Sequence, residues 1–182
     1  MRIHRKAILI DTHNDILSTS ILEGKDISHR LAEGQSDLVR WNEGGVDVQF
    51  FSVWTGNSPR NKEGFYTDAV QEIDSLNYEV LRNYERMKMA YTYNDVLKGI
   101  KKDKLVCLIG VEGGHMIEND LSKLEELYSC GMRYMTLTWN NSTSWAPSAM
   151  DETIHSNSLK HKGLTEFGRR VVQKMNELGV IV

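Results

Sequence analysis

The stretch Ala7–Asp15, which reads Ala-Ile-Leu-Ile-Asp-Thr-His-Asn-Asp, contains the pattern that decides the fold. Its apolar run, Ala7–Ile10, is rich in branched side chains and too short for a helix, which predicts a strand buried on both faces. Such strands usually belong to parallel sheets covered by helices. His13 and Asp15 follow two residues apart, so in extended backbone both side chains point to the same side and form half of a divalent-metal site.

Four further apolar segments of strand length follow along the chain. They are Val46–Trp54, Leu105–Val111, Met132–Thr138 and Val180–Val182, where a fifth strand begins. Segments with helical periodicity or capping residues separate them: Asp37–Glu43, Thr67–Met89, Asn94–Lys102, Leu121–Cys130 and Thr165–Leu178. The intervals Ile16–Ser36 and Trp139–His161 are predicted as loops, the first with short helical turns.

Three of the helices end at a glycine that comes just before a strand, at Gly44, Gly131 and Gly179. This repeated β-α order predicts an α/β fold with a parallel sheet. A doubly wound sheet would need a glycine-rich turn after its first strand, but His13-Asn14-Asp15 stands there, which favours a barrel. A (β/α)8 TIM-like barrel needs about 250 residues. We therefore expect the chain to form an incomplete barrel with about four and a half β-α units.

The composition excludes several classes of function. Lys and Arg number 22 against 25 Asp and Glu, without a basic stripe, so we expect no nucleic-acid partner. There is no apolar stretch long enough for a transmembrane segment, and the run after Met1–Lys6 is too short for a secretory leader. As numbered, the chain is expected to be cytoplasmic, or exported if a leader precedes Met1. Cys107 and Cys130 are predicted to be two buried, reduced thiols.

Glu112 is the third candidate metal ligand, because it follows the apolar strand Leu105–Val111 and is backed by Gly113-Gly114. A solvated loop residue is the alternative for a glutamate in this position. His13, Asp15 and Glu112 together suit zinc, with iron or manganese as alternatives. Glu112 could also bridge two metals in a hydrolase site.

The remaining histidines, aromatic residues and serines receive mostly structural interpretations. His115 could act close to Glu112, or it could be a packed histidine bonded to backbone. Phe50, Phe51 and Trp54 are predicted as core and pocket wall, and the serines near residue 145 lack the frame of a serine nucleophile. The other four histidines are expected at the surface or in solvated loops: His4, His29, His155 and His161.

Four motifs together resemble the membrane (renal) dipeptidase family of zinc peptidases. They are Ile10-Asp11-Thr12-His13-Asn14-Asp15, Gly110-Val111-Glu112-Gly113-Gly114-His115, Arg133-Tyr134-Met135-Thr136-Leu137-Thr138 and Gly163-Leu164-Thr165-Glu166-Phe167-Gly168. The resemblance runs in family order from about Ile8 to Val182 and covers essentially the whole chain.

The resemblance implies a (β/α)8-type barrel that holds two zinc ions, with His13 and Asp15 on one zinc and Glu112 bridging both. It implies dipeptide substrates, hydrolysed by a water that the metals activate. Some members of the family also open β-lactams or accept a D-residue at the C-terminal side.

The sequence departs from the family pattern at two places. Trp139 stands where members often have a histidine that polarises the scissile carbonyl, so Asn140 or Asn141 is the candidate neutral donor, and Trp139 and Trp54 are candidates for the substrate pocket. The other two zinc histidines and a substrate-binding arginine of the family lie beyond the fifth strand. The resemblance therefore implies that residues 1–182 are the N-terminal part of a single metal-dependent hydrolase barrel domain, truncated and able to hold at most one zinc well. With uncovered strand edges, we expect the chain either to self-associate as a homo-oligomer or to be only marginally stable.

Three hypotheses remain open from the sequence. The first is a zinc dipeptidase that acts on small dipeptides. The second, suggested by Trp139, is another barrel amidohydrolase that acts on a lactone or a non-peptide amide. The third is a catalytically inactive fragment that serves as a binding or assembly module.

Overall fold

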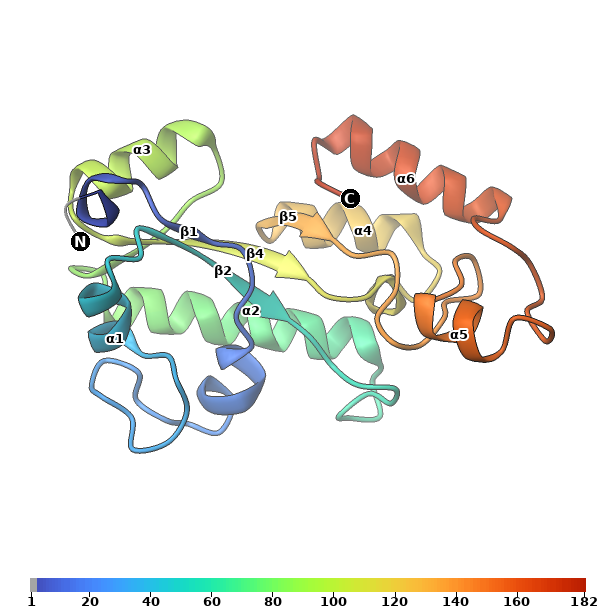
Figure 1. Ribbon diagram of the computed structural model, residues 1–182, viewed down its shortest axis with the longest axis horizontal. Coiled ribbons are helices and arrows are strands. Elements are labelled where there is room, and N and C mark those ends of the chain that lie inside the picture. Colours follow the sequence, from blue (N-terminus) through green and yellow to red (C-terminus); the bar gives the residue numbers. More distant parts are fainter. Residues whose placement is uncertain (1–2) are drawn as a thin grey trace. The chain divides into compact units, whose positions relative to one another are not determined.

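The computed structural model describes residues 3–182, apart from the side chain of Arg5, and the chain divides into two compact units. The first unit runs to Val53 and resumes over Gln71–Gly110, and the second unit comprises Trp54–Val70 and Val111–Val182. Helices and parallel strands alternate along the chain, as Figure 1 shows, which confirms the predicted α/β class.

The first unit is built on a parallel sheet with the strand order β1-β2-β4-β3. The bounds of these strands are β1 Ile10–Asp11, β2 Val48–Val53, β3 Met87–Met89 and β4 Leu105–Val111. Buried Val48, Ala90 and Val106 form a core cluster on this sheet, and Val96 and Ile100 of helix α3 (Tyr93–Lys101) pack against it. Figure 1 shows α3 and the part of α2 that belongs to this unit on opposite sides of the strands.

The strand predicted at Ala7–Ile10 is shorter and more exposed than expected. Only Ile10–Asp11 forms a strand, after a 3-10 turn at His4–Lys6, and Ile8 and Ile10 are 56% and 49% exposed. The prediction of burial on both faces is therefore wrong. Within the described residues β1 pairs only with β2 and lies at the edge of the sheet, so part of its apolar surface has no neighbour.

The long helix predicted over Thr67–Met89 ends earlier than expected. Helix α2 spans Phe65–Arg82, and the carbonyl of Asn83 then accepts hydrogen bonds from the amides of Arg86 and Met87, both at 2.8 Å. This turn lets the chain enter the sheet as β3, where Met87 lies opposite the first residue of β4. The helix prediction over Met87–Met89 is wrong, because pairing with a distant strand outweighs the local apolar periodicity.

Local capping fixes the ends of the helices. The Asp37 side chain accepts from the amide of Arg40 at the start of α1 (Leu38–Gly44), and left-handed Gly45, rather than Gly44, ends that helix. Thr165 and Gly179 cap α6 (Glu166–Leu178) in the same two ways. The predicted bounds of α1, α3, α4 and α6 are confirmed to within one residue at either end.

The second unit contains α4 (Leu121–Ser129), β5 (Met132–Met135) and α6, after a 3-10 turn at Gly114–Ile117. The amide of Thr136 donates to the carbonyl of Val111, which pairs β5 with the end of β4. The expected fifth strand is a single parallel bridge between Tyr134 and Ile181. Lys174 Nζ, on α6, lies 2.8 Å from Glu125 Oε1, on α4, so an ion pair connects these two helices.

Two further expectations in the second unit need correction. The segment predicted as the polar loop Trp139–His161 contains helix α5 (Ala149–Ile154), capped by Ser148, and it carries the almost fully buried Trp145. Cys107 is buried as expected, but Cys130, at the end of α4, is partly exposed; among the described residues neither cysteine is in a disulfide. Over residues 3–182 no helix is both long enough and apolar enough to cross a bilayer.

Candidate metal centre

The end of β1 brings His13 and Asp15 together in the first unit. The amide of Ser52, in β2, donates to the carbonyl of Asn14 at 2.9 Å, so the backbone continues alongside β2 after Asp11. His13 Nε2 and Asp15 Oδ1 lie 3.3 Å apart, and the two side chains are 40% and 49% exposed. This arrangement, which the spacing of two residues predicts, leaves a nitrogen and an oxygen donor open to solvent.

Polar contacts from the next loop support this strand end. The side-chain amide of Asn14 donates to Ser36 Oγ at 2.8 Å, and its carbonyl oxygen accepts from the amide of Ile16 at 3.1 Å. The carbonyl of Asp15 accepts from the amide and the hydroxyl of Thr19, at the start of a π-helical turn. These groups border a cavity of about 390 Å³ next to His13 and Asp15. His13 and Asp15 therefore form part of the wall of a largely polar cavity.

Glu112 lies in the second unit, directly after β4, and is only partly exposed. The turn that follows it, at Gly113-Gly114, is tightly packed. A methyl group on Gly114 would lie 2.5 Å from the Trp145 ring and 2.6 Å from the carbonyl oxygen of Leu137. Gly113 adopts φ +113°, which is open to glycine and strained for other residues. The two glycines are therefore required by the close approach of Trp145 and by the backbone conformation.

The structure favours the packed interpretation of His115, one of the two that the sequence left open. His115 Nε2 lies 3.3 Å from the carbonyl oxygen of Thr55, and the ring meets Phe65 edge-on at 4.9 Å. Nδ1 is buried and has no hydrogen-bond partner among the residues that the structure describes. Burial lowers the pKa of His115 below its usual 6.5, so this histidine is neutral at neutral pH.

The predicted substrate-facing residues also lie in the second unit. The rings of Trp54 and Trp139 meet edge-on with centroids 5.1 Å apart, so these two candidate pocket residues are in contact. The carbonyl of Asn140 accepts from the hydroxyl of buried Ser148 at 2.8 Å. The side-chain oxygen of Asn141 is buried and has no partner within the described part of the chain, so it remains available to a donor.

The sequence did not indicate the groups that hold these strand ends. In the first unit, buried Asp37 accepts from the amides of Arg40 and Leu31 and pairs with the Arg40 guanidinium. In the second unit, the carbonyl of Trp145 accepts from the amide of Thr165, which fastens the loop after β5 to the start of α6. An aspartate three residues before an arginine was the only local signal for the first group, and a tryptophan within a polar segment was the only one for the second.

Strand ends that present histidine and carboxylate ligands on a parallel α/β sheet are typical of metal-dependent hydrolase barrels. Comparison with known families defines the class further. The profile described as "Membrane dipeptidase (Peptidase family M19)" matches residues 1–182. The chain belongs to this family of metallo-dipeptidases, as the four motifs predicted.

Curated relatives are longer than this chain. Dipeptidase 3 from Rattus norvegicus is 34% identical over 179 residues, which cover 96% of this chain and 36% of the relative. Dipeptidase 3 from Homo sapiens is 32% identical over 181 residues, with the same two coverages. The chain therefore spans about a third of the length of these relatives, at 36%.

Solved structures show the same fold. A metallopeptidase from Rhodobacter sphaeroides, determined with a phosphinate mimic of the dipeptide L-Ala-D-Ala, superposes with a TM-score of 0.78 at 22% identity and covers 96% of this chain and 57% of its own. A probable dipeptidase from Pseudomonas aeruginosa has a TM-score of 0.78 at 19% identity and covers 99% and 47%. The parallel α/β sheet thus matches about half of these family structures, in agreement with the expected partial barrel.

Proposed function

We propose that this chain contributes His13, Asp15 and Glu112 to the metal centre of a zinc-dependent dipeptidase. The observation that carries the proposal is the approach of His13 Nε2 to Asp15 Oδ1, 3.3 Å apart at the carboxyl end of a parallel strand. In the proposed centre His13 and Asp15 would hold one zinc, and Glu112 would be a ligand as well.

The strand register of the first unit supports the inclusion of Glu112. The amide of Val106 donates to the carbonyl of Asp47, so β4 begins beside the start of β2, and Glu112 is the sixth residue after Val106. Ile10 pairs at the start of β2 as well, and Asp15 is the fifth residue after Ile10. Because parallel strands advance by about 3.3 Å per residue, we expect the two carboxylates to lie at similar positions along their strands.

The donor set suits the metal. One imidazole nitrogen and carboxylate oxygens are ligands that zinc accepts, and the absence of a thiolate from the set leaves manganese and iron as alternatives. When bound, the metal supplies a Lewis acid and lowers the pKa of a water towards neutrality. The side chains of this chain then orient that water and the substrate.

The second unit supplies the groups for substrate orientation. The side-chain amides of Asn140 and Asn141 are neutral donors that would replace the missing histidine in contacting the scissile carbonyl. The Trp54–Trp139 pair forms an aromatic wall, which would exclude water from the neighbouring peptide bond. Family membership supports dipeptides as the substrate class, and a structural neighbour binds a dipeptide mimic.

The test combines zinc binding with hydrolysis. We expect a saturable zinc site, and we expect Asp15→Asn to weaken it by more than about a hundredfold, because loss of a ligand should exceed the 10–100-fold effects of outer contacts. Asp74→Asn, an exposed change on α2, is the matched control. Unchanged zinc affinity in Asp15→Asn would disprove the proposed centre.

A second candidate function, a barrel amidohydrolase for lactones or non-peptide amides, is favoured by one observation. Trp139 packs on Trp54 and offers only an indole N–H, so the site lacks the titratable group that dipeptide hydrolysis uses in many family members. A panel of dipeptides, lactones and N-acyl amino acids distinguishes the two functions. If zinc does not bind and no compound of the panel is hydrolysed, the chain would be a binding or assembly module.

A further inference from the structure

The loop after β5 encloses a cavity of about 610 Å³ that is separate from the cavity next to His13 and Asp15. Its lining lies wholly within residues 142–161 of the second unit. A cavity of this size falls in the range of small-molecule sites, about 300–1,000 Å³. The side chains that line the cavity determine which kind of molecule it can bind.

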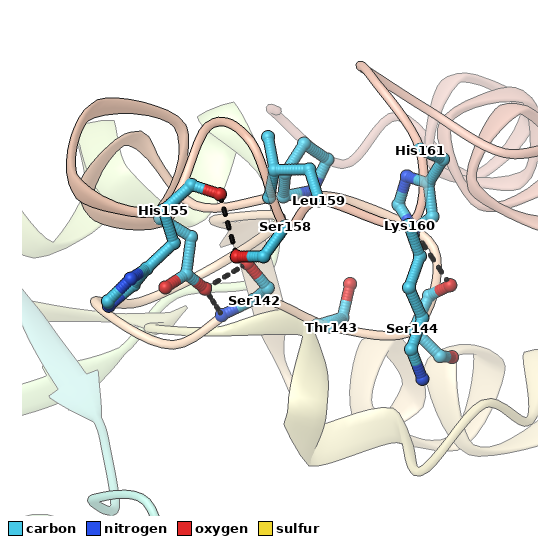
Figure 2. Close-up of a pocket in the computed structure, with 10 residues that line it drawn as sticks. Ser142, Thr143, Ser144, His155, Ser158, Leu159, Lys160 and His161 are labelled. Atoms are coloured by element: carbon cyan, nitrogen blue, oxygen red, sulfur yellow. Dashed lines mark hydrogen bonds between the residues drawn. The ribbon is translucent and has the colours of Figure 1, made fainter.

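Hydrogen bonds hold the two walls of this cavity in place. On one side Asp151 accepts from the amide and the hydroxyl of Ser142, and Ser142 Oγ accepts from the amide of Ser148. On the other side His161 Nε2 lies 3.1 Å from the carbonyl oxygen of Ser144, and Nδ1 lies 3.0 Å from that of Gly163. Figure 2 shows Ser142 on one side of the pocket and His161 and Ser144 on the other. Hydrogen bonds therefore fix part of each of these two walls.

The charged side chains that line the cavity differ in whether they already have partners within the protein. Asp151 is the single acidic residue of the lining, and its carboxylate is engaged by Ser142, whose hydrogen bonds hold the pKa of Asp151 below its usual value. Lys160 also lines the cavity, and its ammonium has neither an ion pair nor a hydrogen bond to any described residue. The His155 ring also lines the cavity, and it makes no hydrogen bond to any residue that the structure describes. The lining thus offers the Lys160 ammonium and the His155 ring as donors, and its one carboxylate accepts hydrogen bonds from Ser142 through Oδ2.

The hydroxyl groups add acceptors without adding free charge. Ser158 donates to the carbonyl of His155 at 2.9 Å, and Thr143 donates to the carbonyl of Ala146 at 3.3 Å. Thr143 Oγ1 already accepts from the amides of Trp145 and Ala146, whereas Ser158 Oγ can still accept hydrogen bonds from a ligand. Apolar contact is limited to Pro147 and Leu159, so a large hydrophobic ligand would leave these polar groups unsatisfied.

We propose that this cavity binds a small polar molecule with one anionic group, to which the Lys160 ammonium donates a charge-assisted hydrogen bond while serine hydroxyls contact the rest of the molecule. A carboxylate and a phosphate both satisfy this chemistry. The site contains none of the proposed metal ligands, so the inference goes beyond the proposed function and does not depend on it.

The test uses metal-free protein, prepared by chelation and dialysis, titrated separately with succinate and with inorganic phosphate. Amide chemical shifts of residues 142–161 report binding. We expect saturable shifts with at least one of the two anions, and the anion that binds more tightly identifies the source of the charge. Lys160→Gln should weaken that binding about tenfold, as expected for loss of one hydrogen bond to a charged group.

Lys162→Gln is the matched control, because Lys162 lies two residues away, is exposed and does not line the cavity. We expect it to bind the anion as the unchanged protein does. Equal weakening in Lys160→Gln and Lys162→Gln would indicate general charge attraction and would overturn the proposal, as would the absence of saturable shifts with both anions. Because no metal is present, neither result depends on whether the zinc centre exists.

Discussion

The two strand ends that carry the candidate ligands are supported in different ways. In the first unit, the end of β1 is held by polar contacts: Asn14 bonds Ser36, and buried Asp37 anchors the loop that contains Ser36. In the second unit, the end of β4 is held by packing of Trp145 against Gly114. The first kind of support depends on charge and hydrogen-bond direction, and the second depends on volume.

This difference matters for a metal centre because ligands must be held close to their binding geometry. His13 and Asp15 follow a two-residue edge strand and are about half exposed, whereas Glu112 follows a seven-residue strand that is almost fully buried. We infer that the packed end is preformed and that the polar end is the more easily perturbed. Changes of volume and changes of charge should therefore act on different ends.

The largest expected effect is that of Gly114→Ala on the packed end. The added methyl group would meet the Trp145 ring at 2.5 Å and a backbone oxygen at 2.6 Å, and backbone cannot move away cheaply. Overpacking of this kind costs about 1–3 kcal/mol or more. We expect the free energy of unfolding in urea to fall by about 3 kcal/mol, near the top of that range.

Gly56→Ala is the control for this change. Gly56 has no neighbouring atom within 4 Å of an added methyl group, and it has no positive φ, so the substitution should change stability by less than about 0.5 kcal/mol. Equal stability of the two variants would show that the turn after Glu112 is not close-packed.

Asp37→Asn tests the polar end at constant volume. In the variant, the side-chain NH2 would replace one of the carboxylate oxygens that accept from the backbone N–H groups of Leu31 and Arg40. Two donors would then face each other, so we expect the free energy of unfolding to fall by about 2 kcal/mol at neutral pH. Asp120→Asn is the control, because exposed Asp120 caps α4 through Ser122 and asparagine is an equally good cap. It should change stability by a few tenths of a kcal/mol, about the spread among good caps.

The cost of Asp37→Asn should also depend on pH in a defined direction. Burial alone would raise the pKa of Asp37, but hydrogen bonds from Arg40 and Leu31 and the Arg40 charge lower it below 3.8. A lowered pKa contributes stability that is present above the unfolded value and is lost as pH falls below it. The difference in the free energy of unfolding between the unchanged protein and Asp37→Asn should therefore shrink as the pH falls below about 3.8. A constant difference down to pH 2 would contradict the role of the Asp37 charge.

His115 provides a smaller, pH-dependent test of the packed end. Because burial lowers its pKa below 6.5, the unfolded chain binds a proton more readily than the folded chain in that range. Stability should therefore fall as pH decreases from about 7 to about 5, and His115→Gln should reduce this slope. Urea unfolding at a series of pH values measures the slope, and equal slopes in His115→Gln and the unchanged protein would mean that His115 is solvated.

The elements that the sequence predicted well are those whose signal is local. The apolar run Leu105–Val111 coincides with β4, and the caps Thr165 and Gly179 fix the ends of α6. The i,i+2 spacing predicted the approach of His13 to Asp15 for the same reason. These features depend on a few consecutive residues and on backbone geometry.

The features that the sequence missed depend on residues far apart in the chain. Met87–Met89 continues the apolar period of the preceding helix, and only pairing with β4 makes it a strand. Trp145 stands among polar residues, and its burial depends on the space left by Gly114 and Gly168. The edge position of β1 likewise depends on which strands are its neighbours, which no local pattern encodes.

The smallest expected effect is that of Ser36→Ala, which removes the acceptor of the Asn14 side-chain amide. The bond is 2.8 Å long and half-buried, so its loss should cost about 0.5–1.5 kcal/mol, at the low end because water can replace the hydroxyl. Ser75→Ala is matched in chemistry, since Ser75 Oγ bonds a backbone carbonyl on the exposed side of α2, and it should be nearly neutral. Amide exchange at Asn14 and Asp15 distinguishes support of the strand end from a general loss of stability. If Ser36→Ala leaves exchange there unchanged while Gly114→Ala accelerates it, the polar contacts do not hold the ligand pair, and the contrast between the two strand ends is wrong.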